Sequence, residues 1–255
     1  MKNSSKSEDL LALLLSGLEV ILRPSPSNIL RFFDPWDDPD RLRRQLWLLE
    51  RSKLVEKQGH GPASSIHLTA GGRMAARGGV DAVRRWQRAW DGKWRLLLFD
   101  LPARNQQLRL RWWRWLRSQR FGFLQLSVWV TPDPVGEARL PLRSLTLTPE
   151  SLTVMESTPV APDADADIVQ AAWDFQLINR RYQEAIDFMQ EGLALTGRTD
   201  AKRTQLRRWL AAERETWLEA VSLDPFLPEA LLPADYLGRH AWAKREATFA
   251  GLWRT

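Results

Sequence analysis

A single carboxylate, Asp100, follows a stretch of chain that is typical of a buried strand. The mostly apolar run Trp94–Phe99 predicts a strand covered on both faces, and the carboxyl ends of such strands often carry functional groups. One carboxylate could hold Mg²⁺ if a symmetry mate supplied a second across a dimer axis. The sequence around Asp100 offers no second carboxylate to complete a site, and Asp-Leu-Pro also forms a plain turn. A metal site and a structural turn are therefore alternatives, and the turn is favoured.

A second group of candidate residues lies on a basic helix predicted over residues 40–53, DRLRRQLWLLERSK. Asp38 and Pro39 are typical of a helix start, because Asp caps free N–H groups and proline fits the first helical position. At about 100° per residue, one side of this helix collects the apolar positions Leu42, Leu46 and Leu49. The opposite side carries Arg44, Trp47 and Arg51, with Arg41 beside them. A large ring between outward arginines predicts a contact surface.

Two short runs after this helix, residues 54–58 and 65–68, predict a β-hairpin around the turn Gly59-His60-Gly61-Pro62. With further helices predicted over residues 8–23 and 27–33, the order is that of a winged helix-turn-helix. Its third helix enters the major groove of DNA and its hairpin lies along the backbone. The predicted contacts with double-stranded DNA are Arg41, Arg43, Arg44, Trp47, Arg51, Lys57 and His60. A small helical domain that binds protein is the alternative interpretation.

The C-terminal part is predicted to be helical over residues 167–195, 201–222 and 238–253. One segment there combines four cations with an aromatic ring: Lys202, Arg203, Arg207, Arg208 and Trp209. The cations would suit the phosphates of a small anionic ligand, and the ring could flank it. This pattern predicts a small-molecule effector site. A solvated helix face is the alternative.

A third basic segment, residues 84–120, holds eleven Lys and Arg residues against two acids, which favours a polyanionic partner. Its helix, predicted over residues 104–120, interleaves arginines with Trp112, Trp113 and Trp115. Such interleaving can stack on single-stranded bases. It is also typical of a core stripe with a solvated arginine face, and both interpretations stay open here.

The composition excludes several classes of function. The 255 residues contain no cysteine, which rules out disulfides and thiolate metal sites and fits a cytoplasmic protein. The three histidines do not cluster, so no zinc site is expected. The sequence lacks a P-loop, a dinucleotide fingerprint and a nucleophile elbow, and we expect neither a cofactor nor enzymatic activity. No apolar run is long enough to cross a bilayer, and no signal peptide is expected.

These segments predict an α+β protein in four parts. Residues 1–72 form the winged helix-turn-helix, residues 73–92 a connecting helix, residues 93–160 a central α/β domain, and residues 161–255 a helical domain for effector binding and dimerisation. The central domain begins with a predicted βαβ unit. Its elements are a strand at 94–99, the helix at 104–120 and a strand at 124–130, followed by strands at 145–147 and 151–156.

Three long stretches carry a resemblance to a known family. They are Trp90-Asp91-Gly92-Lys93-Trp94 running into LLLFDLP, then GFLQLSVWVTP, and LLPADYLGRHA towards the end. The chain resembles the PaaX family of transcriptional regulators, which are named for phenylacetic acid degradation. The resemblance implies a winged helix-turn-helix, a ferredoxin-like α/β domain and a helical C-terminal domain. Because residues 132–156 look shorter and richer in proline than the family's second helix, we expect an abbreviated ferredoxin-like domain.

The resemblance also implies a function. We expect a DNA-binding repressor that is a homodimer on a palindromic operator and is released by a small-molecule effector, such as an aryl- or acyl-CoA thioester. The family's middle domain is similar to small CRISPR-associated nucleases, whose metal-binding aspartate matches Asp100. A Mg²⁺-dependent nuclease that uses Asp100 is therefore one alternative function. A helical scaffold without a role on DNA is another.

Overall fold

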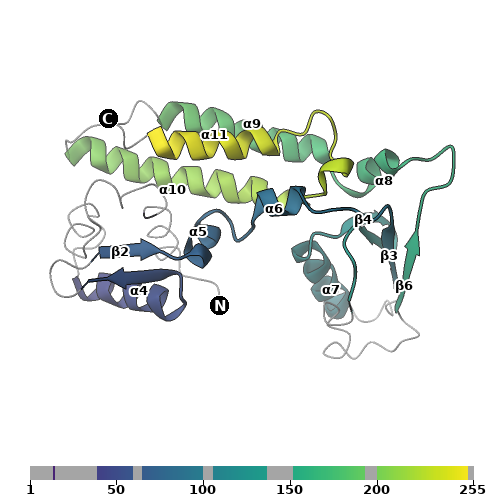
Figure 1. The fold of residues 1–255 in the computed structure, drawn as a ribbon, viewed down its shortest axis with the longest axis horizontal. Helices are drawn as coiled ribbons and strands as arrows, with labels where there is room; N and C mark the ends of the chain where they lie inside the picture. The colour runs from purple at the N-terminus through teal and green to yellow at the C-terminus, as the bar shows by residue number, and fades with distance from the viewer. Residues whose placement is uncertain are drawn as a thin grey trace. The chain divides into compact units, whose positions relative to one another are not determined.

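The computed structural model describes residues 39–59, 65–99, 106–136, 152–192 and 200–251, together with Leu14 (Figure 1). These residues form helices and two antiparallel sheets, so the expected α+β class is confirmed. By their contacts, the residues group into two compact units. One comprises residues 1–81, 179–222 and 237–255, and the other comprises residues 82–178 and 223–236. The four-part division of the chain stays a prediction.

In the first unit, α4 (Pro39–Arg51) lies next to the antiparallel strands β1 (Val55–Gln58) and β2 (Ser65–Leu68). The helix and hairpin predicted for this part of the chain are confirmed. Leu49 of the helix and Val55, Ile66 and Leu68 of the hairpin are buried. The helices predicted over residues 8–23 and 27–33 lie outside the described residues, apart from the buried Leu14. The complete winged helix-turn-helix therefore stays a prediction.

A capping residue joins the hairpin to the next helix, α5 (Ala70–Ala76). Thr69 Oγ1 accepts a hydrogen bond from the Gly72 backbone N–H at 2.9 Å and donates one to the Lys53 carbonyl at 2.7 Å. These bonds hold Gly72 against the loop after α4. A Cβ atom at Gly72 would lie 1.8 Å from the carbonyl oxygen of Leu54. The site therefore has no room for a side chain.

The Gly72→Ala variant is expected to lower the free energy of unfolding by about 1–3 kcal/mol or more, because the backbone of Leu54 must move to make room. Gly71→Ala is the matched control, since its nearest contacts would be ordinary ones at 3.6 and 3.7 Å. Urea unfolding of both variants measures the difference. Equal stability of the two variants would contradict the close approach at Gly72.

The structure replaces the single connecting helix predicted over residues 73–92 by two short helices, α5 and α6 (Ala82–Trp86). Gly78 and Gly79 lie between them with φ angles of 102° and 77°. This is the left-handed region, which glycine adopts without the steric cost of a Cβ atom. The helical hydrogen-bond pattern cannot continue through two such residues, so α5 ends before them.

The second unit contains a four-stranded antiparallel sheet in the order β4-β5-β3-β6. Its elements are β3 (Trp94–Phe99), α7 (Gln106–Ser118), β4 (Gly122–Gln125), β5 (Val128–Thr131) and β6 (Leu152–Ser157). The predicted βαβ unit with one strand at 124–130 is wrong. That run forms a hairpin of β4 and β5 around a turn in which Leu126 has a φ of 44°. Both neighbours of β3 are antiparallel to it.

Helix α7 lies against the sheet (Figure 1). A cluster of large apolar residues fills the contact. The buried members are Leu97, Phe99, Trp112, Leu116 and Trp129. Gly122 of β4 contacts the next helix, α8 (Asp165–Ala172), and a Cβ atom there would lie 2.6 Å from that of Ala172. The ferredoxin-like arrangement stays a prediction, because residues 137–151 lie outside the described part of the chain.

An ionic cluster joins β3 to β6. Arg95, whose side chain is 7% exposed, donates hydrogen bonds to Asp91 at 2.5 Å and to Glu156 at 3.0 Å. Lys93 pairs with Glu156 at 2.8 Å. The hydrogen bond from Arg95 holds the pKa of Asp91 below its ordinary value, and those from Lys93 and then Arg95 do the same for the pKa of Glu156. The cluster therefore stabilises the ionised carboxylates in the folded state.

We expect this cluster to make stability fall with acid. A carboxyl group with a lowered folded-state pKa stabilises the protein above its unfolded pKa, near 3.8 for Asp91 and 4.5 for Glu156. That contribution is lost as the pH falls through the folded-state pKa. Asp91→Asn/Glu156→Gln should therefore be less stable than the wild type at pH 6, and the difference should shrink towards pH 3. Urea unfolding over this range checks it, and parallel curves would contradict it.

Helices form the rest of the described chain: α8, α9 (Phe175–Gly192), α10 (Asp200–Leu223), the short 3-10 helix η8 (Glu229–Leu231) and α11 (Gly238–Gly251). The helices predicted at 201–222 and 238–253 correspond to α10 and α11. The helix predicted over residues 167–195 is two helices, because Trp173 has an extended backbone (φ −136°, ψ 138°). Asp174 then starts α9 by accepting a hydrogen bond from the Leu177 N–H at 2.8 Å.

In the first unit, α9, α10 and α11 lie side by side (Figure 1). Their contact is aromatic, with Trp217 of α10 against Trp242 of α11 (centroids 5.0 Å apart) and Tyr182 of α9 (5.9 Å). An ion pair is buried among these rings. Arg245, 4% exposed, donates to Glu213, 2% exposed, through Nε at 2.6 Å and Nη2 at 3.1 Å.

Candidate nucleic-acid interface

The outward face of α4 carries an exposed tryptophan among arginines. Trp47 is 53% exposed, and Arg44 and Arg51 are exposed on the same helix. The apolar side of α4 supplies the buried Leu49, so the predicted opposition of the two faces agrees with the structure. A surface helix normally turns a ring of this size towards the core. The exposure of Trp47 therefore makes this face of α4 a candidate contact surface.

Local contacts order the cations on this face. The guanidinium of Arg51 lies 5.1 Å from the centre of the Trp47 ring, within range of a cation–π interaction. Arg43 pairs with Asp40 at 3.0 Å, and both side chains are about three quarters exposed. Such an exposed pair contributes little to stability, on the order of 0–1 kcal/mol. Arg43 can therefore exchange Asp40 for another anion at little cost.

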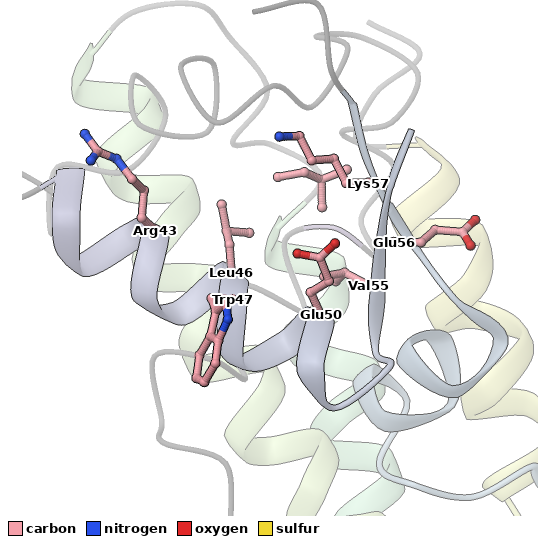
Figure 2. A pocket seen from close by; sticks show the side chains of 8 residues that line it. Arg43, Leu46, Trp47, Glu50, Val55, Glu56 and Lys57 are labelled. Carbon is pink, nitrogen blue, oxygen red and sulfur yellow. The ribbon is translucent and has the colours of Figure 1, made fainter. Parts of the chain in front are cut away.

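A shallow hollow of about 160 Å³ lies between α4 and the hairpin (Figure 2). Its lining combines apolar, basic and acidic side chains: Arg43, Leu46, Trp47, Glu50, Val55, Glu56, Lys57 and Ile66. In Figure 2 the Glu56 carboxylate points away from α4. The structure thus brings Lys57 of β1 to the same hollow as Arg43 and Trp47 of α4.

The sequence did not single out the acidic members of this hollow. Glu50 lies one turn after Trp47 on α4, so the helical period alone could have placed it beside the ring. The place of Glu56 depends on the pairing of β1 with β2, so the sequence pattern alone could not have predicted it. Two other predicted contacts, the side chain of Arg41 and the whole of His60, lie outside what the structure describes. Their roles stay predictions.

The predicted effector residues all lie on α10. Trp209 is 6% exposed, stacks on Phe188 at 6.0 Å and donates from its indole N–H to the Phe188 carbonyl. Its neighbour Arg208 is exposed. The side chains of Lys202, Arg203 and Arg207 lie outside the described residues. The effector assignment stays a prediction, and a ligand would reach the Trp209 ring only by displacing its packing.

Asp100, the residue of the nuclease alternative, lies outside the described residues. Within the described ranges, no group of three or more His, Cys, Asp or Glu side chains could hold a metal ion. Also within those ranges, no helix is long and apolar enough to span a membrane.

Comparison with known proteins identifies the middle of the chain. Residues 87–169 match the family model described as the PaaX protein central Cas2-like domain. The resemblance to the PaaX family is confirmed. The PaaX-like segment spans β3 to β6, the sheet of the second unit, and continues into α8.

A similar solved structure covers almost the whole chain. It is the uncharacterized protein Rv0674 from Mycobacterium tuberculosis, with a TM-score of 0.60 and 22% sequence identity over 95% of this chain and 93% of that one. The two proteins therefore share a fold over nearly the whole chain, well beyond residues 87–169. The curated proteins contain no match.

Proposed function

We propose that this protein is a transcriptional regulator that binds operator DNA through α4 and the β1–β2 hairpin. These would be the recognition helix and the wing of a winged helix-turn-helix. The observation that carries the proposal is the exposed Trp47 between Arg44 and Arg51 on a helix whose other side carries the buried Leu49. The PaaX-like central segment supports it, since regulation of transcription is the role of that family. We propose further that the protein acts by binding alone, without catalysis.

The cations of this surface divide by chemistry. Arginine can donate two parallel hydrogen bonds to the O6 and N7 atoms of guanine, which adds about 1–3 kcal/mol of discrimination between bases. Arg44 and Arg51 on α4 are proposed to act in this way. Arg41 is proposed to face the groove as well. Arg43, Lys57 and His60 would contact the phosphate backbone, which adds affinity that depends on salt but no sequence preference.

The proposal is tested by fluorescence anisotropy with DNA from the promoter of the protein's own gene. We expect tighter binding to promoter DNA than to scrambled DNA of the same length, and a steep decline of affinity between 50 and 200 mM salt. Equal affinity for the two DNAs would contradict sequence-specific binding. Absence of binding at 50 mM salt would remove the DNA-binding function altogether.

We also propose that a small molecule releases the repressor from its operator, with an aryl- or acyl-CoA thioester as the class that suits the cations of α10. A near-complete switch requires the ligand to favour the released state by about 5.5 kcal/mol. Repeating the anisotropy titration with a panel of acyl-CoAs identifies the effector. An unchanged affinity across the panel would exclude this class of ligand.

A homodimer is part of the same proposal, because a palindromic operator presents two equivalent half-sites to a two-fold symmetric protein. The cytoplasmic location follows from the proposed function, since the operator lies there. Sedimentation equilibrium measures the mass in solution. A mass that stays at that of one 29.5 kDa chain over the micromolar range would contradict the dimer.

A further inference from the structure

Helix α7 of the PaaX-like segment carries a stripe of arginines that the proposed function does not use. Arg111, Arg114 and Arg117 recur every third residue and are all exposed. Since a helix rises about 1.5 Å per residue, the stripe extends about 9 Å along one side of α7. The helix contains no acidic residue. Neighbouring turns therefore carry positive charge only.

Nothing in the described part of the chain neutralises these cations. Among the described residues, Arg111, Arg114 and Arg117 make no ion pair and no side-chain hydrogen bond. Other arginines of the same unit are paired, since Arg85 and Arg88 contact Asp133 and Arg95 contacts Asp91. Within the described ranges, the stripe is thus a local excess of positive charge and differs from an ordinary mixed surface.

The aromatic residues of α7 show which kind of polyanion the stripe suits. Trp112 is fully buried and stacks on Trp115 at 5.1 Å, with 16° between the ring planes. Trp113 packs on Phe123 at 6.1 Å and on Trp129 at 6.4 Å. Because these rings pack against the sheet, they do not form a platform on which unpaired bases could stack. The arginines are left to contact phosphates, which a duplex presents on its outside.

We propose that Arg111, Arg114 and Arg117 of α7 form a second DNA contact, which binds the phosphate backbone of duplex DNA without reading its sequence. This inference rests on the proposed DNA-binding function. Duplex DNA carries about one negative charge per 1.7 Å of its axis, so a stripe of about 9 Å faces enough phosphates for all three arginines. The contact adds affinity for any duplex and leaves base recognition to α4.

The test is the variant Arg111→Gln/Arg114→Gln/Arg117→Gln, since glutamine supports a helix about as well as arginine. Affinity for promoter and scrambled duplexes is measured by fluorescence anisotropy between 50 and 200 mM NaCl. Each lost phosphate contact makes the slope of log affinity against log salt shallower by about 0.9, so the triple variant should be shallower by about 2.7. The advantage of the wild type then grows about 40-fold from 200 to 50 mM salt. We expect equal losses on both duplexes.

The matched control is Arg180→Gln/Arg239→Gln/Lys244→Gln, which removes the same charge from α9 and α11. A salt slope of the triple variant equal to that of the wild type would overturn the inference and leave the α7 arginines as a solvated face. An equal loss in the control would overturn it too, because net charge would explain the effect. If the wild type binds neither duplex, the proposed function itself fails. If the triple variant unfolds, the single variant Arg114→Gln replaces it and must make the salt slope shallower by about 0.9.

Discussion

Replacing Arg44 and Arg51 together by alanine is expected to weaken binding to promoter DNA by about 30-fold or more, while binding to scrambled DNA changes far less. Each arginine that is bidentate to guanine supplies about 1–3 kcal/mol of discrimination, and about 1.4 kcal/mol corresponds to a factor of ten in affinity. Removal of Arg51 also leaves Trp47 without the cation that lies 5.1 Å from its ring. Fluorescence anisotropy with both DNAs measures the ratio of affinities.

The control for this variant is Arg180→Ala/Arg239→Ala, which removes two exposed arginines from α9 and α11. Alanine favours a helix at all four positions, so neither double variant should unfold. A ratio of promoter to scrambled affinity that stays at the wild-type value in Arg44→Ala/Arg51→Ala would show that α4 does not read bases. An equal fall in the control would show that the effect comes from net charge.

Removing one partner of the buried ion pair is expected to destabilise the helices of the first unit severely. In Glu213→Ala, the guanidinium of Arg245 would stay buried, 4% exposed, with no carboxylate beside it. Such a loss typically costs about 3–5 kcal/mol. At about 2–4 °C per kcal/mol for a chain near this size, the unfolding midpoint should fall by about 6–20 °C. Differential scanning calorimetry measures this shift.

Two further variants separate the ion pair from general packing. Glu213→Met/Arg245→Met replaces both charges by apolar groups and should cost far less than Glu213→Ala, although the contacts of Arg245 with the Trp217 and Phe249 rings are lost. Glu184→Ala breaks the half-exposed pair with Arg181 and should cost no more than about 1 kcal/mol. If Glu213→Ala costs no more than Glu184→Ala, the buried pair does not stabilise the fold as its geometry indicates.

Much of the candidate site follows from local sequence. The helical period placed Trp47, Arg44 and Arg51 on the side of α4 opposite the leucines, and the structure exposes Trp47. The turn residues after α4 likewise indicated the β1–β2 hairpin. Helix position and turn chemistry depend on neighbours within a few residues, so the sequence carries this information directly.

Two breaks between helices had a weak signal in the local sequence, and the helical pattern on both sides of each break obscured it. Gly78 and Gly79 stand in the middle of the segment predicted as one connecting helix, and their positive φ angles end α5. Trp173 has an extended backbone between α8 and α9, although it fits the apolar period of one continuous helix. Apolar periodicity continues across such breaks, because residues on both sides still face a core.

The sequence by itself determined the face of α4, the positions of α10 and α11, and the PaaX-like stretch that the family comparison matches. Only the tertiary structure decided that residues 122–131 are a hairpin of β4 and β5 and that Glu213 meets Arg245. Leu126, at the hairpin turn, is 86% exposed with a φ of 44°. Glycine or asparagine usually occupies this conformation, and the sequence has neither at the turn, so it gave no signal for the hairpin. Strand pairing and buried ion pairs join residues that are distant in sequence, and their energy comes from burial that exists only once the chain has folded.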